Sequence, residues 1–390
     1  MKPPISPRVD SVPLLDVARS NGPLREQFLQ ALTDVLDSGR FVFGPWCEQL
    51  EEAVAELCGT AHAVGCASGS DALILALLAA DVGPGDDVLV PSFTFFATVS
   101  AVTRLGARPV LVDIDPHTFN IDPQELARAA TPETKAVIPV HLFGQCADMD
   151  PILQLAAQRG WFVIEDAAQA IGAGYRSQFA GSLGHVGCFS FYPTKNLGGM
   201  GDGGMLTTDD AEIAERLRRL RNHGMHPRYH HKEVGLNSRL DSFQAAVLGV
   251  KLPHLAAWTH ARRENAARYT ELFEQADLGE GFVIPREEQG SLHVWNQFTV
   301  RVTGGRRDEL KQHLASRGVG SEIYYPVPAH RQQCFRGASV HLAGRLPHTE
   351  AAAAEVLSLP ICPERTEAEI ETVVARVSEF FAAGHSAKAA

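Results

Sequence analysis

Two side chains of this sequence, Lys195 and Asp166, could act together on a bound aldehyde. Lys195 follows an apolar, strand-like run at 188–192 and a short polar turn, and Asp166 ends a second apolar run at 161–164. A lysine amine on a rigid turn can form a Schiff base with the aldehyde of pyridoxal 5'-phosphate (PLP), and an acid at a strand end can keep the ring nitrogen protonated. Taken alone, Lys195 is better explained as a surface lysine beside a buried strand, and only the surrounding pattern favours the Schiff base.

A serine- and glycine-containing turn, Ala67 to Leu73, opens a predicted helix. Gly69 lets the backbone approach a ligand closely, and Ser70 offers a hydroxyl where the unpaired N–H groups of a helix start point outward. This pattern predicts a phosphate site. The alternative is that Ser70 serves only as the helix N-cap.

Three more side chains are candidates for the same site. Phe95 follows the predicted strand at 88–90 and could stack on a flat ring, with core packing as the alternative. Ser190 precedes Lys195 by five residues and could reach the same phosphate. Gln169, three residues after Asp166, could hydrogen-bond the ring.

Two other patterns are better explained without a second cofactor or a metal. Gly199, Gly201 and Gly204 match G-x-G-x-x-G, but they lead into a strand-like stretch at 205–208, whereas a dinucleotide fingerprint opens a helix. The histidines of the 221–232 loop have no carboxylate or cysteine at a metal-ligand spacing, so we expect solvated histidines or a substrate contact and no metal site.

The elements that must position these residues alternate between strand and helix from about residue 50 to 220. The strands are unbroken apolar runs, which favours a mainly parallel α/β sheet sandwiched by helices. Ligands of such sheets bind at the C-terminal ends of strands, which is where Asp166 falls. Strands are predicted at 88–90, 110–112, 136–140 and 161–164, and helices at 70–80, 96–105, 123–130 and 149–159.

The pattern changes after residue 241. We predict a large domain over residues 1–250, including an N-terminal arm, and a smaller α/β domain over residues 251–390. The predicted elements of this part are a long helix at 241–275, strands at 296–302 and 321–325, and helices at 308–317, 350–357 and 367–383.

Composition excludes several classes of protein. The net charge of −11 argues against a nucleic-acid surface. The longest apolar run, Ala72 to Ala80, is far shorter than the roughly 20 residues that a membrane span needs. Seven scattered cysteines without a C-x-x-C pair indicate reduced thiols, and Met1 to Pro13 lacks the apolar stretch of a signal peptide. We therefore expect a cytoplasmic protein.

In order and spacing, these pieces resemble the DegT/StrS family of sugar-nucleotide aminotransferases, which are fold-type I PLP enzymes. The likeness runs from about Pro13 to Val377. It is carried by Gly44-Pro45, Ala67 to Leu73, Pro91 to Thr98, Val112 to Asp115, Val140 to Gly144, Glu165 to Ala170, Ser190 to Gly198, Gly235 to Asp241, Tyr324 to Pro326 and Leu357 to Pro360.

The resemblance implies how the cofactor is bound. Lys195 matches the Schiff-base lysine and Asp166 the partner of the pyridine nitrogen. Further roles follow for residues that would contact the ring hydroxyl (Gln169), stack on the ring (Phe95) and hold the phosphate (Gly69, Ser70 and Ser190).

It also implies a shared site in a homodimer. Asn237 matches an asparagine that reaches the cofactor phosphate of the neighbouring subunit. Arg239 and Tyr325 fall where such enzymes contact the sugar nucleotide. His330 lies in a proline-containing run that departs from the usual pattern of the family, which leaves its substrate contact open.

The activity implied is transfer of an amino group from L-glutamate to a keto-sugar of a nucleoside-diphosphate sugar, for amino-sugar biosynthesis. Gly235 to Asp241 looks more like the loop of enzymes that act at carbon 3 than at carbon 4. One alternative is a sugar dehydratase, but those relatives carry histidine in place of Lys195. The other is a non-catalytic regulator, and the presence of Lys195, Asp166 and Ser190 argues against it.

Overall fold

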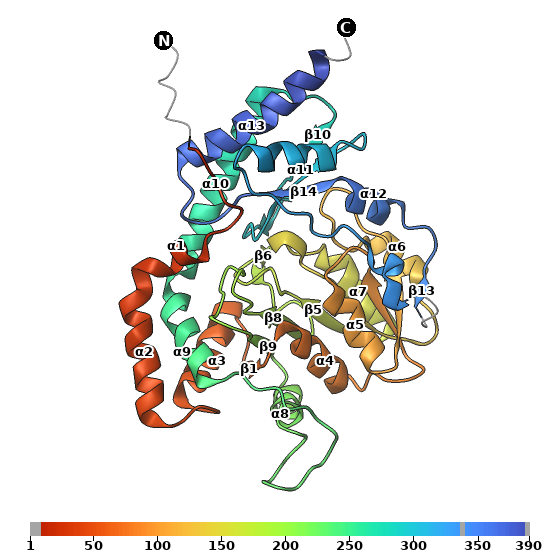
Figure 1. Cartoon of the computed structure of the whole chain (residues 1–390). Helices are drawn as coiled ribbons and strands as arrows, with labels where there is room; N and C mark the ends of the chain where they lie inside the picture. Colours follow the sequence, from red (N-terminus) through yellow and green to blue (C-terminus); the bar gives the residue numbers. More distant parts are fainter. Residues whose placement is uncertain (1–8, 336–339, 387–390) are drawn as a thin grey trace.

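The structure is a computed structural model that describes residues 9–335 and 340–386. A large central sheet is flanked by helices, and a smaller group of helices and strands lies at one end (Figure 1). The predicted α/β class is confirmed. The segment Met1 to Pro13, on which the expected location partly rests, falls largely outside the described residues.

Within these ranges the central sheet has eight strands, and only β9 is reversed relative to its neighbours. The glycine-rich run after Lys195 leads into β9, as the strand-like stretch at 205–208 predicts. In spatial order the strands are β1 (His62–Cys66), β9 (Gly204–Thr208), β8 (Val186–Ser190), β5 (Phe162–Asp166), β4 (Thr134–Val137), β2 (Asp87–Pro91), β3 (Arg108–Val112) and β13 (His341–Leu342).

Helices cover both faces of this sheet, as its unbroken apolar strands predict. Val88 and Val90 pack in one core layer and Leu89 in the other, because successive side chains of a strand point to opposite faces. The first layer includes α4 (Gly69–Ala79), α5 (Phe96–Arg104) and α8 (Ala211–Leu220). The second includes α3 (Pro45–Cys58), α6 (Pro123–Ala129), α7 (Met149–Arg159) and α9 (Ser242–Lys251).

The long helix predicted at 241–275 is wrong as a single element. The chain forms α9, then a short 3-10 turn η3 (Leu252–His254), then α10 (Leu255–Ala276). Pro253 explains the break, because its ring removes a backbone donor and clashes with the preceding turn of a helix. At the N-terminal end of the chain, α1 (Val17–Asn21) and the 3-10 turn η1 (Gly22–Leu24) lead into α2 (Arg25–Ser38), which lies beside α9.

The smaller group has its own core, which also takes in Val12 from the N-terminal segment. Its antiparallel sheet is formed by β10 (Phe282–Val283), β12 (Phe298–Val302) and β14 (Val356–Leu359). Its helices are α10, α11 (Arg307–Ser316) and α13 (Glu367–Ser386), and α12 (Pro347–Glu355) packs nearby. The boundary at residue 250 stays a prediction.

The strand predicted at 321–325 is wrong. That segment makes one isolated bridge, Glu322 to Ser358, and otherwise runs as an irregular connection. Pro326 and Pro328 follow it, and proline cannot donate to a sheet ladder. The connection places Tyr324 and Tyr325 at the central cavity instead.

The remaining elements are short. A third, antiparallel sheet contains β11 (Ser291–Leu292), β6 (Gly174–Tyr175) and β7 (Gln178–Phe179), and 3-10 turns lie at η2 (Leu142–Gly144), η4 (Ala329–Arg331) and η5 (Gln333–Phe335). Over the part of the chain that the structure describes, no helix is both long and apolar enough to cross a membrane.

Candidate active site

A cavity of about 600 Å³ opens at the C-terminal ends of β5 and β8, next to the first turn of α4. These two strands are parallel neighbours with Asp166 opposite Cys188, so the residues that follow them emerge at one edge of the sheet. The volume lies in the range of small-molecule sites. Eight of the eleven residues singled out from the sequence line it: Gly69, Ser70, Phe95, Asp166, Gln169, Ser190, Lys195 and Tyr325.

Asp166 is buried, and both of its carboxylate oxygens are held. Thr98 Oγ1 donates to Oδ2 at 2.8 Å, and the Ala168 N–H donates to Oδ1 at 3.2 Å. Burial raises the pKa of Asp166, while these hydrogen bonds and the nearby Lys195 amine oppose the rise. A buried carboxylate gains most from a cationic hydrogen-bonding partner. Asp166 therefore fits the protonated ring nitrogen of PLP.

The adjacent carboxylate, Glu165, belongs to the scaffold. It is fully buried and accepts N–H donors from the 181–184 turn at 2.7–2.8 Å, and His141 Nε2 donates to it at 2.9 Å. His141 Nδ1 accepts the Ala147 N–H at 3.1 Å, which fixes the ring proton on Nε2. Of the two neighbouring carboxylates at the end of β5, Asp166 lines the cavity.

Lys195 lies on a turn that is hydrogen-bonded back onto itself. Its N–H donates to the Tyr192 carbonyl at 2.9 Å, and the Phe191 N–H donates to the Gly203 carbonyl at 2.8 Å. Burial lowers the pKa of Lys195 to about 8, with Asp166 acting in the opposite direction. The neutral amine is the nucleophilic form, and it is more populated near neutral pH than for an exposed lysine.

The first turn of α4 forms an anion cradle. Ser68, not Ser70, is the N-cap, and its hydroxyl accepts the Asp71 N–H at 3.1 Å. Ser70 is exposed and lines the cavity. A Cβ on Gly69 would lie 2.7 Å from the Ser190 Cβ, so only glycine lets the helix start approach β8 this closely. The converging hydroxyls and helix N–H groups fit a phosphate.

The aromatic side of the cavity is built from α5 and the 324–325 connection. The Phe95 ring is 56% exposed and lies 5.8 Å from the Tyr325 ring, centroid to centroid. Gln169 Nε2 donates to Tyr325 Oη at 3.2 Å, and Gln169 Oε1 accepts the Phe143 N–H at 2.7 Å. Phe95 is thus available to stack on a ring, as a core phenylalanine would not be.

Three predicted residues lie outside the cavity of their own chain. Asn237 is exposed, and the Arg239 guanidinium donates to Asn222 Oδ1 at 2.9 Å. His330 Nδ1 lies 2.9 Å from Ser92 Oγ, and its Nε2 lies 3.3 Å from Glu350. His330 lines a different cavity, so the structure does not bring the proposed substrate contact to Lys195.

Several residues at the site escaped the sequence reasoning. Thr94 precedes α5 and Thr98 lies in its first turn, and their hydroxyls lie 2.9 Å apart. Both fall in the Pro91 to Thr98 piece of the resemblance, which could have marked them. Tyr324 lies in the Tyr324 to Pro326 piece of the resemblance, but only Tyr325 of that piece was assigned a role. Asp202 and Gln297 also line the cavity.

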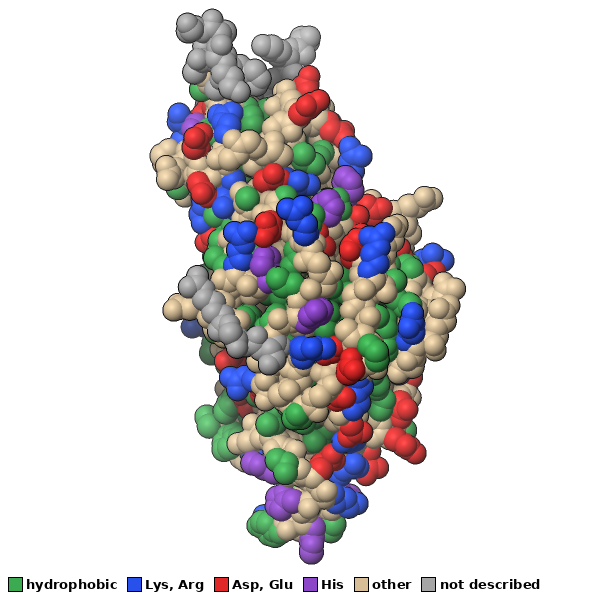
Figure 2. Space-filling model, turned by 90° about the vertical axis from the view of Figure 1, so that its right-hand side faces the viewer, with side chains coloured by type: hydrophobic (Ala, Val, Ile, Leu, Met, Phe, Trp, Pro, Cys, Tyr) green, Lys and Arg blue, Asp and Glu red, His purple; other side chains and the backbone are tan. Residues whose placement is uncertain are grey.

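The histidine-rich loop after α8 projects from the body of the molecule (Figure 1). His223, His226, His230 and His231 are all exposed, and Figure 2 shows histidine side chains gathered at this end. Among residues 9–335 and 340–386, no group of three or more histidine, cysteine or acidic side chains is placed to hold a metal ion.

Residues 23–378 match the DegT/DnrJ/EryC1/StrS aminotransferase family. The chain belongs to this family. It is a PLP-dependent aminotransferase, and the predicted family, fold and cofactor are confirmed.

Curated members of the family align along almost the whole chain. A pleiotropic regulatory protein of Geobacillus stearothermophilus is 48% identical, covering 95% of this chain and 99% of its own. A UDP-N-acetyl-3-dehydro-alpha-D-glucosamine 3-aminotransferase of Acidithiobacillus ferrooxidans is 47% identical, with coverages of 94% and 98%. A dTDP-3-amino-3,4,6-trideoxy-alpha-D-glucose transaminase of Streptomyces venezuelae is 45% identical, with coverages of 95% and 96%.

Solved structures of the family share this fold. DesV of S. venezuelae in complex with a ketimine intermediate superposes with a TM-score of 0.91 at 45% identity, covering 96% of this chain and 99% of that one. NtdA of Bacillus subtilis with bound PMP gives 0.89 at 32% identity, with coverages of 97% and 86%.

Proposed function

We propose that this aminotransferase moves an amino group from L-glutamate to the keto carbon of a nucleoside-diphosphate sugar, and that it prefers 3-keto over 4-keto sugars. The observation that carries the proposal is one cavity lined by both Lys195 and Asp166 beside an anion cradle. Two relatives, 47% and 45% identical, are named for amino transfer at carbon 3 of a sugar nucleotide, which supports the substrate class and the carbon. The likeness of the Gly235 to Asp241 loop supports the same carbon.

The roles proposed for the central residues follow from their chemistry. PLP, when bound, supplies an electron sink for the charge that develops at the carbon next to nitrogen. Asp166 would keep the ring nitrogen protonated, and Lys195 would hold the cofactor covalently. Once displaced, Lys195 Nζ would take a proton from the α-carbon of the amino donor as general base and later act as general acid.

The surrounding residues would orient these groups. Ser70, Ser190 and the N–H groups of α4 would hold the phosphate, with Gly69 keeping the space clear. Phe95 would cover one face of the ring. Gln169 would reach the ring hydroxyl, and Tyr325 would contact the sugar nucleotide.

We also propose a homodimer with shared sites. Asn237 is exposed and stands apart from the cavity of its own chain, which suits a contact with the phosphate bound by a second copy. Arg239 would contact the sugar nucleotide near the same interface between the two subunits.

The experiment that tests the substrate proposal uses ¹⁵N-labelled glutamate and a panel of matched 3-keto and 4-keto sugar nucleotides. Mass spectrometry measures the ¹⁵N in each product. We expect ¹⁵N in the 3-keto products first. Faster labelling of 4-keto sugars would overturn the carbon preference, and loss of a hydroxyl without gain of nitrogen would instead identify a dehydratase.

Borohydride reduction of the loaded protein, followed by peptide mapping, tests the central assignment separately. The label should fall on Lys195, and Lys195→Ala should lose both the label and turnover. A label on another lysine would refute the assignment whatever the substrate proves to be.

A further inference from the structure

A second cavity, of about 30 Å³, adjoins the turn that carries Lys195. It shares Thr194 and Lys195 with the main cavity, and its other walls come from segments far apart in the sequence. We call it the rear chamber. Its polar lining residues include Asn21 at the end of α1, Asn196 on the turn, Lys251 at the end of α9, Arg262 on α10 and Glu364 before α13.

Four of these side chains present buried polar atoms that have no hydrogen-bond partner within the described chain. They are three acceptors, Asn21 Oδ1, Asn196 Oδ1 and Glu364 Oε2, and one donor, Arg262 Nε. Asn196 is only 8% exposed and Arg262 only 5%. Buried polar atoms are nearly always paired, so four unpaired atoms on residues that line one chamber point to a bound partner.

Lys251 ties this chamber to the Lys195 turn. Its side chain is buried, and its Nζ donates to the Gly198 carbonyl at 2.6 Å. Gly198 closes the turn so tightly that a Cβ there would lie 2.4 Å from the Pro193 carbonyl oxygen. The same turn is held a second time by Asn196 Nδ2, which donates to the Val294 carbonyl at 2.9 Å.

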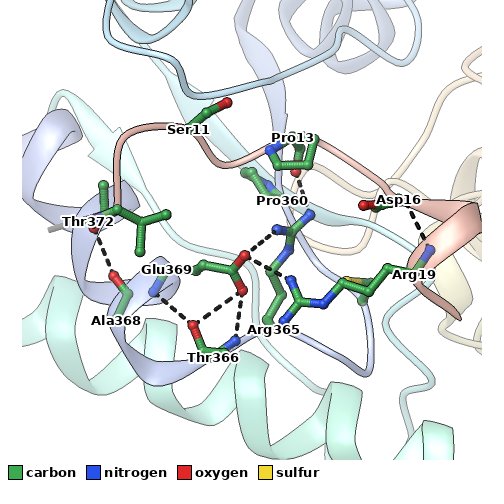
Figure 3. Close-up of polar contacts among 12 residues, drawn as sticks. Ser11, Pro13, Asp16, Arg19, Pro360, Arg365, Thr366, Ala368, Glu369 and Thr372 are labelled. Atoms are coloured by element: carbon green, nitrogen blue, oxygen red, sulfur yellow. Dashed lines mark hydrogen bonds and ion pairs between the residues drawn. The ribbon is translucent and has the colours of Figure 1, made fainter. Parts of the chain in front are cut away.

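Leu15, Val17, Ser20 and Asn21 of the N-terminal segment form part of the chamber wall, and an ion pair from α1 fixes this segment. Figure 3 shows Arg365 and Arg19 both reaching Glu369, while Arg365 also donates to the Pro13 carbonyl. Arg365 has a fully buried side chain. These contacts hold α1 against the start of α13 and so place Asn21 at the chamber.

The charges and unpaired atoms of the lining residues indicate what kind of molecule the chamber binds. Lys251 and Arg262 bring positive charge, which disfavours a metal cation. The three unpaired oxygens disfavour an anion. Water both donates and accepts, and the chamber has room for about two molecules.

We propose that the rear chamber binds one or two water molecules that join α1, α10 and the segment before α13 to the Lys195 turn, and that Lys251 is a positioning residue for that turn. The inference rests on the proposed role of Lys195. Its tests use properties of the protein that do not depend on turnover.

The first test is a high-resolution crystal structure of the wild-type holoenzyme, grown in rubidium bromide. We expect ordered water within hydrogen-bond distance of Asn196 Oδ1 and Glu364 Oε2, with no anomalous peak. An anomalous rubidium or bromide peak in the chamber would overturn the proposal, and so would a chamber without ordered density.

The second test compares Lys251→Met with Lys135→Met by amide hydrogen exchange of the cofactor-free proteins. Lys135 is a control for loss of a lysine elsewhere in the fold: it is partly exposed, its Nζ donates to the Asp81 carbonyl and it pairs with Asp86 at 3.1 Å. We expect exchange of the 195–199 amides to accelerate at least about tenfold in Lys251→Met alone. Unchanged exchange in that variant would refute the positioning role, and the crystal structure still decides on the water if it fails to fold.

Discussion

Glu165 and Asp166 are neighbouring carboxylates of one strand, and they have different surroundings. Glu165 and Asp166 are indistinguishable by composition, and the sequence could place both at a strand end. The structure gives Glu165 four donors within the scaffold and leaves Asp166 lining the cavity. The difference depends on which side of the strand each faces, and a short unbroken apolar run does not reveal that.

Asp166→Asn should abolish most of the activity and spare the fold. The amide still accepts a hydrogen bond from Thr98, but it cannot balance a positive charge on the ring nitrogen. We expect kcat to fall by roughly 10²–10³-fold, the size typical of losing one electrostatic partner in a site. Steady-state kinetics with glutamate would measure this, and wild-type kcat in the variant would contradict it.

Glu165→Gln should lower the stability of the fold, in contrast to Asp166→Asn, which should lower activity. Its amide nitrogen would face the N–H donors of residues 181–184, leaving at least one of them unpaired. We expect the free energy of unfolding to drop by about 1–3 kcal/mol. Chemical denaturation would detect it, and an unchanged midpoint would show that the network is dispensable.

The pKa of Lys195, lowered to about 8 by burial, predicts the pH dependence of cofactor uptake. Only the neutral amine attacks the aldehyde, so uptake by the cofactor-free protein should rise about tenfold per pH unit and level off above about pH 8. Stopped-flow absorbance would follow it. A plateau reached only near pH 10.5 would mean that the amine is not buried in solution.

At the scale of helices and strands, the sequence predicts best those elements that depend only on neighbouring residues. The unbroken strands and the helix α4 follow from apolar runs, although the capping residue is Ser68 and the sequence suggested Ser70. The prediction failed at Pro253, where one breaker divides a continuous apolar pattern, and at residues 321–325. That segment looks like a strand, but its polar groups and the prolines after it suit a connection held by tertiary contacts.

The approach of α4 to β8 gives a prediction at this scale. Gly69→Ala should push the helix start away from Ser190, because the new methyl group would lie 2.7 Å from the Ser190 Cβ. Cofactor affinity should fall at least about tenfold, since the phosphate cradle depends on that approach. Fluorescence titration of the cofactor-free protein would measure the loss.

Gly249→Ala is the matched control. Gly249 lies inside α9, is exposed, and has open space around its Cβ position. Alanine there should leave cofactor affinity unchanged and raise the free energy of unfolding by about 0.5–1 kcal/mol. If both variants lose affinity equally, the cradle argument fails.

At the scale of the whole molecule, the predicted residues divide between two locations. Eight surround the cavity, while Asn237, Arg239 and His330 lie away from it. Sequence reasoning could assemble much of the first set because strand ends meet at one sheet edge, whereas Tyr325 was assigned only from the family resemblance. No local pattern shows which surface of a second copy Asn237 would face.

Mixing two inactive variants would test the shared site. In a heterodimer of Lys195→Ala and Asn237→Ala, one site receives Lys195 from one chain and Asn237 from the other. Co-expression should therefore restore about a quarter of wild-type activity, since half the dimers are mixed and each has one intact site. If Asn237 serves its own chain, neither site is complete and no activity returns.

The buried amine of Lys195 has a practical consequence. Below pH 8 the fold keeps this group protonated in surroundings that disfavour its charge, so removing it takes away a penalty. Lys195→Ala should therefore be at least as resistant to heat as the unloaded parent at neutral pH. Coupled to a resin, this inactive variant becomes an affinity reagent that can capture the natural amino acceptor from a crude extract.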